Sequence, residues 1–129
     1  MEYYFSTIVK AGFEDTITQV VEALKKEGFG IVSEIDMQAK LKEKLGVDFK
    51  KYKILGACNP SFAYKALQTE EKIGTMLPCN IIVIDKENGT TEVSAIQPMA
   101  SMMAIQNPAL EPLANEVTEK LKRVIERLS

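Results

Sequence analysis

One segment constrains the fold more than any other, because residues 79–96 read as two strands joined by a tight turn. Residues 79–86 and 90–96 are rich in β-branched side chains, and Asn88-Gly89 between them is the strongest short-range signal for a β-hairpin. A hairpin pairs two strands in antiparallel order. The sheet of this protein therefore cannot be purely parallel.

The remaining chain alternates between strand-like and helix-like segments. Three more strands are expected where aromatic and β-branched residues cluster or apolar residues alternate, at residues 3–9, 29–35 and 52–58. Four helices are expected where apolar residues recur every three or four positions, at residues 13–26, 37–45, 60–70 and 108–128. Residues 72–78 are expected to form a loop, and Pro98 is expected to end the last strand.

Several helix boundaries carry their own signals. Gly28 and Gly46 follow the first two helices, where a residue in the left-handed conformation commonly ends a helix. Asp36 and Asn59 precede the second and third helices and predict N-caps, and Pro60 suits a first helical position.

This order of elements, β-α-β-α-β-α-β-β-α, predicts an α+β fold. We expect a two-layer sandwich in which a mixed, mostly antiparallel sheet of about five strands carries helices mainly on one face. A doubly wound α/β fold is the alternative. The length of 129 residues fits a single domain spanning residues 1–129.

The composition excludes several classes of function. The chain has no histidine, which rules out serine–histidine–aspartate and cysteine–histidine catalysis and histidine-ligated zinc or haem. A net charge of −2 argues against nucleic-acid binding, because domains that bind nucleic acid usually carry a basic face. The six lysines between residues 40 and 53 are expected to form a solvated helix face and loop, with an anion site as the alternative.

The chain also lacks the patterns of secreted and membrane proteins. Its first residues do not resemble a signal peptide, and the apolar run from Ile81 to Ile84 is far shorter than the about 20 residues of a membrane span. We therefore expect a cytoplasmic protein that does not associate with membranes. Both of its cysteines are then expected to be reduced.

The two cysteines lie in similar surroundings, each beside a proline and an asparagine. Cys58 ends a predicted strand just before a helix, where the positive potential of the helix start stabilises a thiolate, so we expect a reactive thiol there. Cys79 begins a predicted strand, and the two sulfurs can approach if the strands are neighbours. The simpler alternative is that both are small residues filling the core. The candidate ligand-binding residues are Cys58, Asn59, Pro60, Pro78, Cys79 and Asn80.

A metal site has limited support in the sequence. Two thiolates cannot fill a tetrahedral zinc site, and no histidine completes it. Either a symmetric dimer brings four thiolates together, or Cu(I) takes two thiolates and a thioether from Met99, Met102 or Met103. Those methionines are explained more simply as core residues. No metal ligand or cofactor is therefore assigned.

With these residues in view, the chain resembles the domain-of-unknown-function family 302 over nearly its whole length. The segments that carry the resemblance are 27–29, 34–36, 55–60, 74 and 77–80, and the two cysteine motifs are the most specific of them. The resemblance implies a compact α+β domain and a homodimer. It implies no established reaction, so no catalytic residue is carried over.

Three functions remain open. We favour a ligand-binding or sensing module with a site near Cys58 and Cys79. A thiol-dependent redox enzyme is weakened by the lack of a histidine base. The third possibility is a structural or interaction module whose cysteines only pack.

A homodimer is expected from the strand at residues 80–84. Alternation places Ile81 and Val83 on one face of the sheet, and Ile82 and Ile84 on the other. Two short helices are too small to cover the second face fully, so a second copy of the chain is the simplest partner.

Overall fold

Within residues 2–129, which the structure describes, five strands form one antiparallel sheet in the order β1-β5-β4-β3-β2. The structure is a computed structural model. The strands are β1 (Tyr4–Val9), β2 (Gly30–Asp36), β3 (Tyr52–Cys58), β4 (Cys79–Asp85) and β5 (Thr91–Ile96). All four neighbouring pairs are antiparallel, so β1 and β2 run parallel at opposite edges and never pair.

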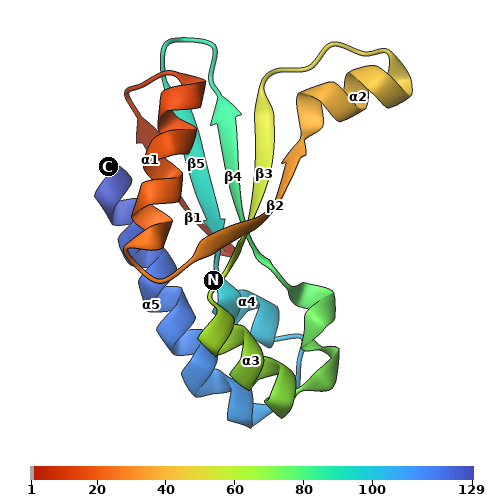
Figure 1. The fold of residues 1–129 in the computed structure, drawn as a ribbon, viewed down its shortest axis with the longest axis vertical. Helices are drawn as coiled ribbons and strands as arrows, with labels where there is room; N and C mark the ends of the chain where they lie inside the picture. Colours follow the sequence, from red (N-terminus) through yellow and green to blue (C-terminus); the bar gives the residue numbers. More distant parts are fainter. Residues whose placement is uncertain (1) are drawn as a thin grey trace.

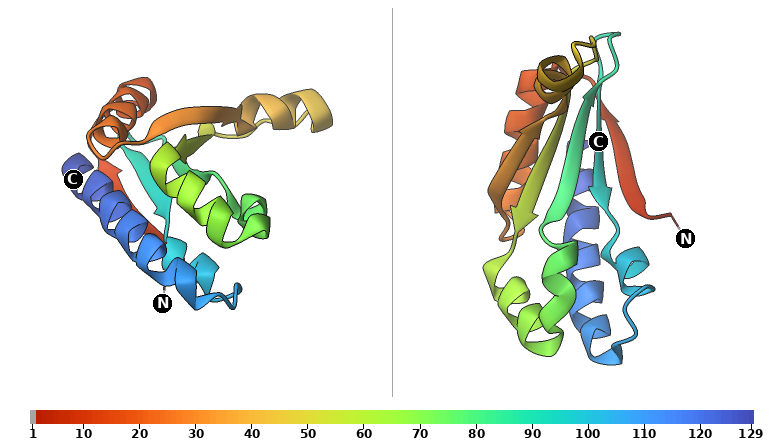
Figure 2. Two further views of the ribbon diagram at one scale, coloured as in Figure 1. Left: turned by 60° about the horizontal axis from the view of Figure 1, so that its bottom comes forward. Right: turned by 90° about the vertical axis from the view of Figure 1, so that its right-hand side faces the viewer.

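Five α-helices and two short 3-10 helices accompany this sheet in the described part of the chain (Figure 1). The α-helices are α1 (Phe13–Lys25), α2 (Met37–Leu45), α3 (Pro60–Thr69), α4 (Pro98–Met102) and α5 (Glu111–Leu128), and the 3-10 helices are η1 (Glu71–Met76) and η2 (Pro108–Leu110). Helices α1 and α5 lie on the same face of the sheet. Helix α2 projects away on the opposite side, while α3, η1 and α4 gather beyond one end of the sheet (Figure 2).

The predicted fold class is confirmed, and the doubly wound alternative is wrong. The main helices, α1 and α5, cover one face, as expected. The expected sheet was mixed, whereas the observed sheet is antiparallel throughout. The hairpin at Asn88-Gly89 is also confirmed, since β4 and β5 pair across it and Gly89 has a φ of +84°.

The hydrophobic core lies between the sheet and the two covering helices. Alternation along β4 buries Ile81 and Val83 completely and leaves Ile82 and Ile84 half-buried on the other face. The core is completed by apolar residues of α1, α5 and the neighbouring strands, which include Val20, Leu24, Leu55, Val93, Ala95, Leu121 and Val124. One face of the sheet is therefore buried in the core, and the other face is partly exposed to solvent.

Three short helices were not expected from the sequence. The expected loop at residues 72–78 contains η1, which is anchored by the buried Ile73. Pro98 ends β5 as expected but also begins α4, and the Gln97 side chain accepts a hydrogen bond from Met99 N at that helix start. The last helix begins later than predicted, because Pro108 starts η2 rather than α5. Elements this short leave little periodicity in a sequence.

An ionic cluster ties the turn after α1 to α5. Glu27 is only 7% exposed, and its carboxylate accepts hydrogen bonds from Arg123 at 3.0 and 3.1 Å and from Arg127 at 2.6 Å. Lys120 Nζ lies 4.0 Å away. The hydrogen bonds from Arg123 hold the pKa of Glu27 below its usual range, against the opposing effect of burial. Glu27 therefore acts as an anion that ties the turn after α1 to α5.

The remaining boundary signals behave largely as expected. Gly28 and Gly46 adopt φ values of +85° and +69°. The Asp36 side chain caps α2 by accepting a hydrogen bond from Ala39 N at 2.9 Å. Among the helices described in residues 2–129, none has the length and apolar character needed to span a membrane.

Candidate functional site: an apolar cavity beside two cysteines

The ends of β3 and β4 bring the two cysteines to the same part of the fold. Cys79 pairs with Ala57 in the β3–β4 ladder, so Cys58 is one residue further along the adjacent strand. Both are free thiols and both are half-buried. The two cysteines could approach each other only if their strands were neighbours, and β3 and β4 are neighbours. Both residues line one cavity.

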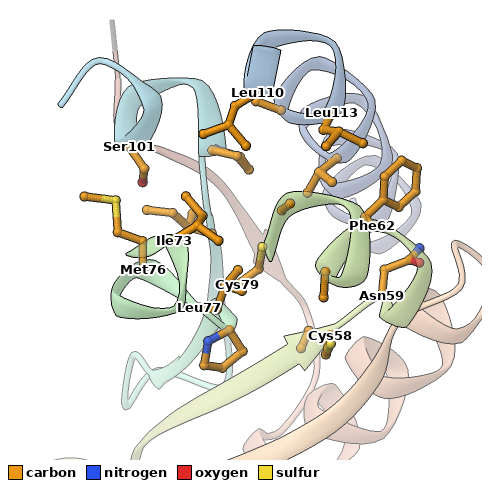
Figure 3. Close-up of a pocket in the computed structure, with 18 of the residues that line it drawn as sticks. Cys58, Asn59, Phe62, Ile73, Met76, Leu77, Cys79, Ser101, Leu110 and Leu113 are labelled. Atoms are coloured by element: carbon orange, nitrogen blue, oxygen red, sulfur yellow. The ribbon is translucent and has the colours of Figure 1, made fainter. Parts of the chain in front are cut away.

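That cavity has a volume of about 370 Å³ and opens beyond the end of the sheet (Figure 3). Its walls come from the ends of the strands and from α3, η1, α4 and the first half of α5. Most of the lining side chains are apolar, including Phe29, Ala57, Phe62, Ala63, Ala66, Leu67, Ile73, Met76, Leu77, Ile96, Leu110, Leu113, Ala114 and Val117. Small-molecule sites commonly start near this size.

Helix α3 explains why the space exists. The helix has an apolar face, yet none of its residues is fully buried. Phe62, Ala63 and Ala66 turn that face toward the cavity instead of packing directly onto the sheet. Leu67 and Met76 at the cavity rim are exposed, so the space is open to solvent.

Few polar groups line this space. They are the thiols of Cys58 and Cys79, the Asn59 amide and the Ser101 hydroxyl. No acidic or basic side chain is among the described residues that form the wall. Lys65 and Lys120 lie close to Phe62, with each Nζ just under 6 Å from the ring centroid. The cavity therefore suits an uncharged, largely apolar molecule.

The predicted site residues divide into two groups. Cys58, Asn59, Pro78 and Cys79 line the cavity. Pro60 and Asn80 do not line it, and both are exposed. Asn80 follows Cys79 on the strand and therefore points to the opposite face, while Pro60 occupies the first turn of α3. Residue type and sequence proximity did not indicate which side chains face inward.

Asn59 has a different role from the one predicted. It occupies the N-cap position of α3, but its side chain makes no capping hydrogen bond. Instead Asn59 Nδ2 donates to the backbone carbonyl of Glu27 at 3.3 Å. A Cβ on Gly28 would lie only 3.0 Å from that same nitrogen. Asn59 thus joins the cavity wall to the turn that carries Glu27.

Gly56 is a supporting residue that the sequence analysis did not single out. It is buried in β3, and a Cβ at this position would lie 2.6 Å from Pro78 Cγ and 2.1 Å from Ser33 Oγ. Such distances are far below van der Waals contact. Glycine at position 56 therefore lets Pro78, which follows a cis peptide bond, approach the sheet beside Cys79.

The two thiols are not equivalent. Burial, with a smaller effect from nearby Cys58, raises the pKa of Cys79 to about 11. Cys79 is therefore a neutral thiol at pH 7 and contributes to the wall as a small apolar group. This argues against Cys79 as a nucleophile, since the thiolate is the reactive form.

Of the three methionines predicted as alternative thioether ligands, Met102 lines the same cavity as the two cysteines. Met99 and Met103 line a second hollow, to which Met102 also contributes, and Met103 is 73% exposed. Met76, which is not among the predicted ligands, also lines the cavity. Within residues 2–129 no group of three or more histidine, cysteine, aspartate or glutamate residues is arranged to hold a metal ion.

Most of the cavity wall was missed by the sequence analysis. Phe62, Ala63 and Ala66 carried a usable signal, because they form the apolar face of a helix that follows a cysteine. The contributions from η1 and α4 carried none, since both elements are very short.

Alkylation rates test the environment of the cysteines. With iodoacetamide at pH 7, Cys79 in the folded protein is expected to react at least a hundredfold more slowly than in unfolded protein. A pKa of about 11 instead of about 8.5 makes the thiolate fraction roughly 300-fold smaller. Cys58 is expected to react first. Peptide mass spectrometry over time measures both rates, and equal rates for Cys79 in the folded and unfolded chains contradict the buried environment.

Comparison with known proteins places this arrangement in a family. Residues 5–128 match the family described as domain of unknown function DUF302. The crystal structure of an uncharacterized conserved DUF302 protein from Bacillus stearothermophilus has a TM-score of 0.92 and 32% sequence identity, covering 100% of both chains. An uncharacterized protein from Aquifex aeolicus is 35% identical over 60 residues, which are 46% of this chain and 41% of that protein. The family match over nearly the whole chain and the structural match agree, and the chain belongs to the DUF302 family.

Proposed function

We propose that this protein is a small-molecule binding module that takes an uncharged, largely apolar ligand into the cavity between α3 and α5. The observation that carries the proposal is an open cavity of about 370 Å³ whose wall is almost entirely apolar. A core normally closes such space, because interiors pack to high density and voids are costly. An open apolar space of this size is the usual form of a ligand site.

The polar groups of the wall favour binding over catalysis. Ser101 offers its hydroxyl to a polar atom of a ligand at one side of the space (Figure 3), whereas the Asn59 amide donates to the Glu27 carbonyl. Cys79 is neutral at pH 7, and no base among the lining residues is available to activate Cys58. The wall thus supplies shape and a few polar contacts, which are the features of a binding site.

The neutral fluorescent probe 1-aminoanthracene tests this proposal. It is expected to bind the native protein with enhanced, blue-shifted emission. The Ala63→Phe variant fills the space from α3 and is expected to bind the probe at least tenfold more weakly. Ala104→Phe makes the same change at an exposed position outside the cavity wall and serves as the matched control.

Two results would overturn the proposal. One is the absence of any probe binding by the native protein. The other is equal binding by native and Ala63→Phe protein, provided that circular dichroism shows both to be folded.

A further inference from the structure

The hydroxyl of Ser101 is the polar group of the cavity wall that the fold leaves without a hydrogen-bond partner. Three threonines elsewhere, Thr16, Thr18 and Thr69, each donate to the backbone carbonyl four residues earlier. The Ser101 hydroxyl in α4 makes no hydrogen bond to another atom of residues 2–129. Figure 3 shows its oxygen directed from α4 toward η1 at the cavity wall. A ligand oxygen can therefore replace the water that this half-buried group binds in the free protein.

The position of Ser101 determines where the polar atom of a ligand lies. Figure 3 places Ser101 and Met76 at one side of the cavity, and Phe62 and Asn59 at the other. The wall between them is apolar apart from the two thiols, which are weak hydrogen-bonding groups. A second polar atom in the middle of a ligand would thus lose its hydration without a good partner. The ligand that fits has one polar atom at one end and an apolar body.

The volume of the cavity limits the length of that body. At the packing density of liquids and protein interiors, about 370 Å³ holds roughly 10 to 15 non-hydrogen atoms. Much of the wall consists of leucine and methionine side chains, including Leu67, Leu113, Met76 and Met102. Such side chains have several rotatable bonds and adapt to the contour of a flexible chain. An unbranched aliphatic chain of about ten carbon atoms matches both the size and the lining.

We propose that the ligand is a medium-chain aliphatic alcohol, or a neutral amphiphile of the same kind, whose terminal hydroxyl pairs with Ser101 and whose chain extends toward Phe62. This inference rests on the proposed function and names the chemical class of its ligand. A hydroxyl both donates and accepts, so it complements the hydroxyl of Ser101 in either direction. A carboxylate or ammonium head group finds no opposite charge among the described residues of the wall, and its desolvation there is costly.

Displacement of 1-aminoanthracene from the full chain tests the ligand class. Hexan-1-ol, octan-1-ol and decan-1-ol are expected to displace it with affinities that rise at least about fivefold from each alcohol to the next, because each added CH₂ group leaves water for an apolar wall. Decanoate and decylamine have the same chain with a charged end. Both are expected to bind at least about tenfold more weakly than decan-1-ol.

A variant of Ser101 tests the polar contact. Ser101→Ala is expected to weaken hexan-1-ol binding about fivefold, which is the effect of losing one hydrogen bond. The same variant is expected to bind 1-chlorohexane, which has the same chain and no hydroxyl, with unchanged affinity. Ser61→Ala removes a hydroxyl from an exposed position of α3 outside the cavity wall, and this control is expected to bind both compounds as the wild-type protein does.

The outcomes separate this inference from the proposed function. If the native protein binds 1-aminoanthracene but no alcohol displaces it, the ligand class is wrong and the proposed function stands. Tighter binding of decanoate or decylamine than of decan-1-ol also rejects a neutral ligand. An unchanged affinity of Ser101→Ala for hexan-1-ol, or an equal loss for 1-chlorohexane, rejects Ser101 as the polar contact. Absence of 1-aminoanthracene binding rejects the proposed function and this inference together.

Discussion

Replacing Glu27 by alanine is expected to lower the free energy of unfolding by about 2 kcal/mol. The carboxylate is 7% exposed and accepts three hydrogen bonds from Arg123 and Arg127, one of them at 2.6 Å. Hydrogen bonds between charged groups are shorter and stronger than neutral ones. The variant loses all three, and with them the contact that holds the turn after α1 against α5. Urea denaturation of both proteins at pH 7 measures the difference.

Glu22→Ala is the matched control. Glu22 lies in the same helix and forms an ion pair with Lys25 at 3.4 Å, but both side chains are more than half exposed. Exposed pairs contribute little to stability, so this variant is expected to unfold close to the wild-type midpoint. Equal losses of unfolding free energy in the two variants would show that the buried position of Glu27 adds nothing to the stability of the protein.

Lowering the pH is expected to destabilise the folded protein in part through the same carboxylate, that of Glu27. Because the folded protein holds the pKa of Glu27 below its usual value near 4.5, the unfolded chain takes up the proton first as the pH falls. The stabilisation from Glu27 is therefore complete above that usual value and is lost as the pH falls through the folded pKa. The Glu27→Ala variant is expected to show a shallower loss of stability between pH 5 and pH 3.

The second large effect is expected at position 56, where alanine in place of glycine should cost about 2 kcal/mol. The added Cβ would lie 2.6 Å from Pro78 Cγ and 2.1 Å from Ser33 Oγ. The Ser33 hydroxyl can rotate away, but the proline ring is rigid and lies against the strand. Pro78 must shift, and the cavity wall beside Cys79 shifts with it. Thermal unfolding measures the stability, and the 1-aminoanthracene titration measures the change in the cavity.

Two variants separate the sources of this strain. Gly30→Ala places a methyl group on the neighbouring strand where no atom lies within 4 Å, so it is expected to be tolerated. Ser33→Ala combined with Gly56→Ala removes the hydroxyl clash and leaves the clash with Pro78. If the double variant regains wild-type stability, the argument that Pro78 requires glycine at position 56 fails.

The cavity and the ionic cluster are mechanically connected. Asn59, at the cavity wall, donates a hydrogen bond to the carbonyl of Glu27, whose carboxylate is held by α5. Helix α5 in turn supplies Leu113, Ala114 and Val117 to the opposite wall. The turn at residues 27–28 thus fixes the spacing between two walls of the cavity.

The sequence alone determined the type and order of the longer elements. β-Branched runs, helical spacing and the Asn88-Gly89 turn led to five strands, to α1, α2, α3 and α5, and to an antiparallel hairpin at β4 and β5. These signals are local, since each depends on residues within one element or one turn. For the same reason Asp36 and Gly46 marked the ends of α2 correctly.

Only the tertiary structure decided which candidate residues meet. Alternation in β4 turned Cys79 toward the cavity and Asn80 away from it, a result that depends on which face the helices cover. Asn59 occupies the N-cap position, but its side chain donates a hydrogen bond to the carbonyl of Glu27 and does not cap the helix. Glu27 is 32 residues earlier in the chain. No local pattern contains a contact at that separation.

The cavity itself could not be predicted from the sequence, for a related reason. Its wall joins segments from Phe29 to Val117, including η1 and α4, which are too short to show a period. An apolar helix face such as that of α3 predicts burial against something, but the sequence does not tell a packed core from an open space. That difference is set by how far α3 stands from α5 and from the ends of the strands, and distances between elements are fixed only when the whole chain packs.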